Sequence, residues 1–215
     1  MIMISNKIQE DFASFLNTYE YFLNSEQFKT LFNPCKCVSL IQVNNYFSDS
    51  EHGFFHGLMV SFMCYLINDE STLVERKSEI YQIFASATLH DFLKPNGVPQ
   101  KEHDVKLRNY YDKLCEETYS HSNPPETDQN KHLIIADRLE LRRYNDYKDW
   151  VDQRFYELYN IMSQELSENL QFFYISMRPS LELHYNTPDS RVKTKFNLVC
   201  DLAKSRMISL CKIYT

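Results

Sequence analysis

The chain has 215 residues, of which 43% are hydrophobic, and its 23 lysines and arginines against 29 aspartates and glutamates give a formal net charge of −6. This length suits one sizeable hydrophobic core, so we expect a single domain over residues 1–215. An acidic chain with no basic run longer than Arg142–Arg143 lacks the positive surface that extended nucleic acid requires.

The composition favours helices. Only three glycines occur in the chain, which leaves little material for hairpin turns or a phosphate-binding loop. Apolar residues recur instead at helical spacing. In chain order, these stripes are Ile8, Phe12, Phe15, Leu16, Tyr19, Phe22 and Leu23; Met59, Met63, Leu66 and Ile67; Ile80, Ile83, Phe84 and Ala87; Leu133, Ile134 and Leu141; Val151, Phe155, Leu158 and Met162; Phe173, Met177 and Leu181; and Val192, Phe196, Val199, Ala203 and Leu210. We therefore predict an all-α fold, a compact helical bundle.

The breaks between these stripes contain proline. They fall at Asn33–Pro34, Lys94–Gly97, Ser122–Pro125 and Thr187–Asp189. No apolar run approaches the about 20 residues that span a bilayer, and the six cysteines are scattered without a paired metal-site or disulfide spacing. We expect a cytoplasmic protein with reduced thiols and no membrane association, and the oligomeric state stays open.

Two histidines lie four residues apart, His52 and His56. On a helix from about Glu51 to Ile67 they would project from one face, in phase with the apolar Met59, and so point inward. An inward histidine is more often a hydrogen-bonded core residue than a metal ligand, so the pair alone predicts little.

A second polar group ends the next predicted helix, where His90 and Asp91 follow the apolar Phe84 and Ala87. Neighbouring side chains on a helix point about 100° apart, so Asp91 continues the buried face while His90 lies to its side. Such a doublet can supply two ligands to one metal, or let the carboxylate bridge two metals. The same pair also arises by chance.

Asp137 lies between Ile134 and Leu141, on the apolar face of a predicted helix. A buried carboxylate needs a partner, which a metal, Arg138 or Arg142 could provide. The chain thus presents histidine, a histidine–aspartate doublet 34 residues later, and an aspartate 46 residues after the doublet. Nitrogen and carboxylate ligands in this order on separate helices are typical of metal-dependent phosphohydrolases.

Short motifs around these residues extend the pattern. They are H-G-F-F-H-G at His52–Gly57, I-F-A-S-A-T-L-H-D at Ile83–Asp91, I-A-D at Ile135–Asp137, D-W at Asp149–Trp150, F-Y-E at Phe155–Glu157, and F-F-Y-I at Phe172–Ile175 with Pro179. In their order they resemble the HD-type metallophosphohydrolases, and most closely the catalytic domain of class I cyclic-nucleotide phosphodiesterases. That family carries H-N-x-x-x-H-A, I-F-A-S-A-x-H-D, A-D-L-S, a downstream tryptophan with E-F-F, and F-I-x-x-I-x-x-P.

The resemblance implies a site for two divalent metals. The tightly bound metal, usually zinc, would be held by His56, His90, Asp91 and Asp137, and Asp91 would bridge to a second ion, magnesium or manganese. Together the metals would polarise the phosphodiester and lower the pKa of a bridging water, so that hydroxide attacks phosphorus in line. His52 would protonate the leaving 3′ oxygen as general acid, because a histidine pKa of about 6.5 leaves a protonated fraction near neutral pH.

The resemblance also implies substrate contacts. Phe172 would stack on the base, unless it is simply a core residue, and Asn169 or Gln171 would stand where the family reads the base with glutamine. Lys94 replaces the family's histidine after the doublet and could contact a phosphate. The chain departs from the family at Thr88–Leu89, where two residues precede the doublet instead of one, and in the short span before Asp137.

In that short span, His103 and His121 are candidates for a histidine that supports the metal ligands. We expect His132 and His184 to be structural or exposed. The predicted function is hydrolysis of a cyclic mono-, di- or oligonucleotide, a small phosphodiester. Two alternatives stay open: a catalytically silent relative that binds a nucleotide or protein, and an HD-type nucleotide phosphohydrolase.

Overall fold

A computed structural model describes residues 2–32, 39–49, 52–67, 77–92, 136–137, 140 and 190–211. Within these ranges the side chains of 2–8, 67, 77–79, 90–91, 190 and 211 lie outside the description.

Helices make up the secondary structure of these ranges, and no strand occurs in them. The helices are α1 (Ile2–Leu23), α2 (Glu26–Leu31), α3 (Leu40–Ser48), α4 (Phe54–Ile67), α6 (Lys77–Phe92) and α11 (Ser190–Cys211). The prediction of an all-α fold is confirmed at this level, while the single domain stays a prediction. None of the helices described is long and apolar enough to cross a membrane.

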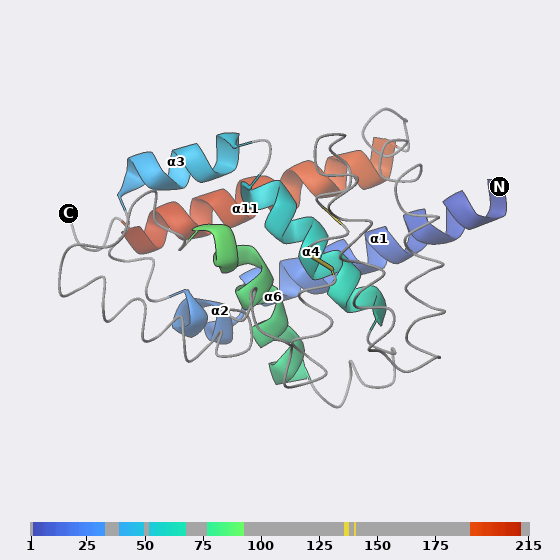
Figure 1. The fold of residues 1–215 in the computed structure, drawn as a ribbon, viewed down its shortest axis with the longest axis horizontal. Coiled ribbons are helices and arrows are strands. Elements are labelled where there is room, and N and C mark those ends of the chain that lie inside the picture. Colours follow the sequence, from blue (N-terminus) through green and yellow to red (C-terminus); the bar gives the residue numbers. More distant parts are fainter. Residues whose placement is uncertain are drawn as a thin grey trace, which may run out of the picture.

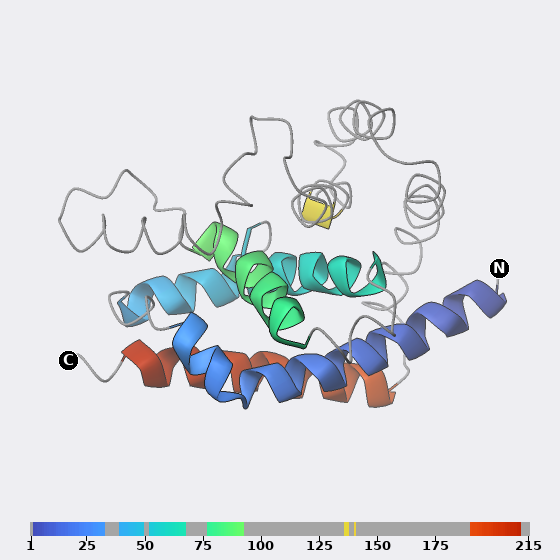
Figure 2. The ribbon, with the colours of Figure 1, turned by 90° about the horizontal axis from the view of Figure 1, so that it is seen from below.

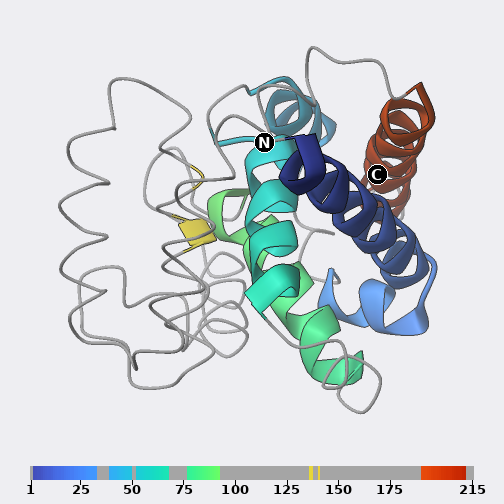
Figure 3. The ribbon, with the colours of Figure 1, turned by 90° about the vertical axis from the view of Figure 1, so that its right-hand side faces the viewer.

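Two layers of helices position the candidate site. The long helices α1 and α11 pack against each other, and α4 crosses α6 in the most extensive contact among the helices that the structure describes (Figure 1). Figures 2 and 3 show residues 136–137 and 140, in yellow, on the side of α4 and α6 that faces away from α1 and α11. The two faces of α4 therefore meet different partners.

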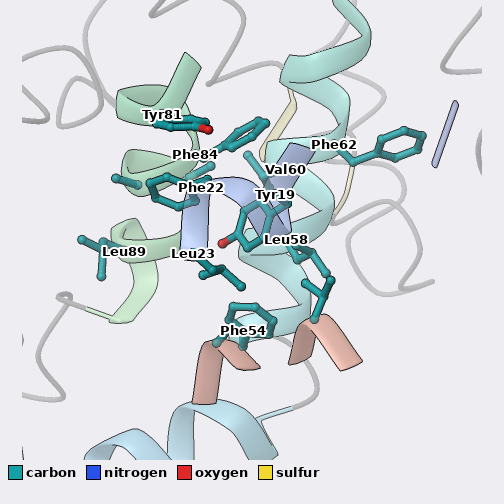
Figure 4. Close-up of a cluster of buried hydrophobic side chains, with 14 of the residues drawn as sticks. Tyr19, Phe22, Leu23, Phe54, Leu58, Val60, Phe62, Tyr81, Phe84 and Leu89 are labelled. Carbon is teal, nitrogen blue, oxygen red and sulfur yellow. The ribbon is translucent and has the colours of Figure 1, made fainter. Parts of the chain in front are cut away.

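The core between α1, α4 and α6 is rich in aromatic rings (Figure 4). Phe15 of α1 contacts Phe62 and Phe84, with ring centroids 5.2 and 5.5 Å apart, and Phe22 contacts Tyr81 at 5.1 Å. All five rings are buried. Each large buried side chain contributes about 1.5–3 kcal/mol through the hydrophobic effect, so the stripe on α1 holds α4 and α6 in place.

Helix α4 is buried around most of its circumference because its sequence, FFHGLMVSFMCYLI, is apolar almost throughout. Its polar residues are His56 and Ser61, and both are buried. The Ser61 hydroxyl donates to the Gly57 carbonyl at 2.8 Å, so it is satisfied within the helix. His56 instead contacts side chains that come from another part of the chain.

The end of α6 is fixed by two tyrosines from other helices. Tyr19 Oη of α1 lies 2.5 Å from Thr88 Oγ1 in a buried hydrogen bond. Tyr46 Oη of α3 donates to the Thr88 carbonyl. Since His90 follows two residues later, these bonds hold the helical turn that carries the histidine–aspartate doublet.

Polar contacts join α1 to α11 away from this region. Lys195 of α11 pairs with Glu20 of α1, and Arg206 donates to Asn24 at 2.7 Å. These bonds lie at the partly exposed edge of the helix pair.

Candidate metal and catalytic site

His56 is held between two carboxylates. Its Nε2 lies 2.9 Å from Asp137 Oδ1, and its Nδ1 is paired with Glu140 Oε2. His56 and Glu140 are fully buried, while 15% of the Asp137 side chain is exposed. The prediction that His56 points inward is confirmed, and this histidine is a partner of Asp137.

The electrostatics of the group follow from its burial. Burial alone lowers the pKa of His56, because it penalises the imidazolium. The charge of Glu140 and the hydrogen bonds to Asp137 and Glu140 outweigh that penalty and raise the pKa to about 10. Without a metal, the imidazole is therefore protonated at neutral pH and neutralises one of the two carboxylates.

The packing of α4 on α6 brings the doublet toward His56. A Cβ on Gly57 would lie 2.8 Å from the Cα of Thr88 and 2.9 Å from the carbonyl oxygen of Ala87, so only glycine allows this approach. His56 precedes the contact by one residue, and His90 follows it by two along α6. The backbone at His56 therefore lies near the turn of α6 that carries the His90–Asp91 doublet. The side chains of His90 and Asp91 are outside the described residues.

His52 lies outside the helix in which it was predicted. The prediction of a helix from about Glu51 is wrong, since α4 begins at Phe54 and His52 sits in the bend before it. Gly53 N-caps α4, its carbonyl accepting from Gly57 N at 3.3 Å, while Asp49 Oδ1 accepts from the His52 backbone at 3.0 Å. The His52 ring is half-buried and still lies 6.0 Å from the His56 ring, centroid to centroid.

The distance between His56 and Asp137 can be compared with the spacing of two ligand atoms on one zinc ion. Zinc binds nitrogen and oxygen at about 2.0–2.2 Å, so two ligand atoms on one tetrahedral ion stand about 3.4 Å apart. The 2.9 Å between His56 Nε2 and Asp137 Oδ1 is the length of a direct hydrogen bond, and the two atoms would move apart slightly around an ion. Among the residues described, no three histidine, cysteine or acidic side chains converge on a metal position, and two of the four expected ligands are outside them.

Glu140 was missed by the sequence analysis. It follows Asp137 by three residues, so the two carboxylates share one face of a helical turn. The signal in the sequence was this D-x-x-E spacing beside an apolar stripe. It was hidden because a glutamate flanked by Arg138 and Arg142 is typical of a solvated surface.

The remaining predicted site residues lie outside the part of the chain that the structure describes. They are Lys94, Asn169, Gln171 and Phe172, with the supporting candidates His103 and His121.

Comparison with protein-family models, with curated proteins and with solved structures found no match to this chain. The resemblance to the HD-type metallophosphohydrolases therefore rests on the sequence motifs alone.

Proposed function

We propose that this protein is a metal-dependent phosphodiesterase that hydrolyses a small cyclic nucleotide. The observation that carries the proposal is the buried His56, whose Nε2 meets Asp137 at 2.9 Å from a helix 81 residues away in sequence. An imidazole and a carboxylate are seldom brought together in an apolar interior unless they belong to a functional site, because burying charged groups is costly.

The proposed metal ligands are His56, His90, Asp91 and Asp137. Divalent metals bound there would polarise the phosphoryl oxygens and make water nucleophilic near neutral pH. Asp137 is the partly exposed member of its pair with His56, so its carboxylate is the side that a substrate and solvent would approach. The protein must hold these metal ligands in fixed orientations. Burial of His56 and its contacts with Asp137 and Glu140 restrict the ring in this way.

His52 is the proposed proton donor. Its position before α4 leaves the ring half-buried, close to His56 yet outside the buried carboxylate pair. The bond from its backbone to Asp49 fixes the bend that carries the ring. A positioned general acid contributes about 10²- to 10⁴-fold to such a reaction.

The proposed substrate is small because the chain, at a net charge of −6, offers no broad attraction for a polyanion. Lys94 would contact a phosphate, Phe172 would stack on a base, and Asn169 or Gln171 would read its edge. Metals would supply the local attraction for the phosphodiester.

One observation favours a second candidate, a catalytically silent relative. Both ring nitrogens of His56 are engaged by carboxylates, so the protein's own side chains satisfy the hydrogen-bonding groups of the ring. A protein that had lost its metals could keep the same buried pairs and bind a nucleotide or a protein.

Metal analysis and turnover separate these candidates. Protein purified without chelator would be measured for zinc, manganese and magnesium, then assayed with added manganese on cyclic mono-, di- and oligonucleotides and on nucleoside mono- and triphosphates. We expect bound zinc and release of a linear nucleotide from a cyclic one. Metal without turnover indicates the silent relative, turnover restricted to non-cyclic nucleotides indicates a general nucleotide phosphohydrolase, and neither metal nor turnover rejects the proposal.

A further inference from the structure

We propose that Glu140 is the positioning residue of the metal site, which orients His56 so that its Nε2 is presented to the ion. This inference rests on the proposed function. Glu140 is paired with Nδ1 of His56, and its side chain is fully buried. It would not touch substrate or metal itself, so its effect would pass through the imidazole.

The two ring nitrogens of His56 have different roles in this arrangement. A carboxylate on Nδ1 accepts a hydrogen bond and keeps the proton on that nitrogen, which leaves the lone pair of Nε2 for a cation. Nε2 is the nitrogen that faces Asp137 at 2.9 Å. A metal held at Nε2 would take the place of a proton on that nitrogen, while the Nδ1 proton would remain on the ring, donated to Glu140.

The spacing of the two carboxylates also fixes the ring. Asp137 and Glu140 are three residues apart on one helical turn and contact opposite nitrogens of one imidazole. The ring is therefore held at both ends and cannot rotate without losing a buried partner. A metal ligand that is already oriented loses less freedom on binding.

A purely stabilising role explains this pair less well. Burying a carboxylate and an imidazolium costs desolvation that the attraction between them scarcely repays, so a buried ion pair is weak evidence for stability. Glu140 and His56 come from segments 84 residues apart, and the sequence of α4 around His56 is apolar almost throughout. The negative charge of Glu140 makes better sense as one that increases the basicity of a metal ligand.

The test compares Glu140→Gln and Glu140→Asp with Glu20→Gln. The glutamine keeps the size of Glu140 and removes its charge. The aspartate keeps the charge, but its side chain is one methylene shorter and places the carboxylate farther from His56. Glu20→Gln makes the same chemical change in the Lys195 ion pair between α1 and α11, away from the site. Zinc affinity would be measured by competition with a chromophoric chelator, and ¹⁵N shifts of the histidine rings by NMR.

We expect Glu140→Gln to weaken zinc binding by about 10- to 100-fold, with Glu140→Asp between it and the unchanged protein. Glu20→Gln should bind zinc as the unchanged protein does. In the zinc-loaded protein, the ¹⁵N shifts of His56 should show a protonated Nδ1 and a metal-bound Nε2.

The outcomes distinguish failure of the proposed function from failure of the proposed role of Glu140. If the unchanged protein binds no zinc, the proposed function fails. If it binds zinc, and Glu140→Gln binds it equally tightly or His56 bears its proton on Nε2, the function stands and the role of Glu140 is rejected. Should Glu140→Gln fail to fold, the NMR measurement on the unchanged protein still decides the tautomer.

Discussion

Gly57 of α4 lies against Thr88 of α6 so closely that a Cβ on the glycine would stand 2.8 Å from the Thr88 Cα. The obstacle is backbone, which cannot move aside as a flexible side chain would. This contact sets the distance between the helix that carries His56 and the helix that ends in the histidine–aspartate doublet.

Gly57→Ala should therefore destabilise the protein, although alanine favours a helix by about 1 kcal/mol over glycine. Overpacking costs about 1–3 kcal/mol, so we expect a net loss of stability together with weaker metal binding. Urea unfolding and zinc titration would measure both. Ser205→Ala, at an exposed position of α11, should change neither. A more stable Gly57→Ala protein with normal zinc affinity would contradict the close approach.

The buried hydroxyls of Tyr19 and Thr88, 2.5 Å apart, give a second prediction. Tyr19→Phe leaves the Thr88 hydroxyl without this partner, and an unsatisfied buried polar group costs about 1–3 kcal/mol. We expect Thr88→Val to cost a similar amount, and the double variant to cost less than the sum. Urea unfolding of the unchanged protein, the two single variants and the double variant gives the coupling free energy between the two hydroxyls. Strictly additive losses would mean that the two hydroxyls do not depend on each other.

Periodicity was enough to predict several of the helices because their apolar stripes face one core. The stripes through Phe15, Ile80 and Val199 fall in α1, α6 and α11, as the spacing predicts. No stripe predicted α3, since it buries only Val43 and Tyr46 and is defined at its start by a Ser39–Gln42 capping box. Local capping chemistry carries little hydrophobic signal.

The inward position of His56 was predictable from the sequence, but its contacts were not. The partners expected for Asp137 were a metal, Arg138 or Arg142, whereas the structure shows a direct contact with His56. The start of α4 was misplaced because local bonds hold the bend before it, from His52 N to Asp49 Oδ1 and from Gly57 N to the Gly53 carbonyl. Hydrophobic periodicity does not report such bonds. Glu140 was missed because its burial depends on a contact with a residue 84 positions away.

Both cysteines with described side chains should be unreactive in the folded protein. Burial, with a contribution from the charge of Asp137, raises the pKa of the Cys64 thiol well above its usual range. Burial and the neighbouring Asp201 raise the pKa of Cys200 to about 12. Since the thiolate is the reactive form, both should react with iodoacetamide at pH 8 at least about 100-fold more slowly than in urea. Peptide mass spectrometry of timed samples would measure this, and equal rates with and without urea would contradict it.

The metal-free protein should lose stability as pH rises from neutral toward 10. The pKa of His56 is about 10 in the folded protein and about 6.5 when unfolded, so the folded state holds its proton more tightly. The stabilisation is complete below about pH 6.5 and is lost as pH rises through 10, with a slope of at most about 1.4 kcal/mol per pH unit. Among the side chains that the structure describes, Asp137 and Glu140 contact His56, the His52 ring lies 6.0 Å away, and the charge of Asp137 also acts on Cys64.

Urea unfolding in EDTA between pH 6 and 10 would measure that slope. His56→Asn removes the titrating group and should flatten the dependence attributable to it. Saturating zinc should also flatten it, because a metal-bound imidazole has already released its Nε2 proton. An unchanged slope in His56→Asn would assign the titration to another residue.

The two histidines should differ when each is replaced by alanine. His56→Ala removes a proposed ligand and leaves Asp137 and Glu140 facing each other without their cation, so we expect loss of tight zinc binding, loss of turnover and reduced stability. His52→Ala removes a half-buried ring outside that pair, so zinc should stay bound while turnover falls by about 10²- to 10⁴-fold. Zinc content, turnover and urea unfolding of the two variants would be measured side by side. Equal loss of zinc from both variants would make His52 a ligand, and its ring, 6.0 Å from that of His56, would then have to turn toward the metal.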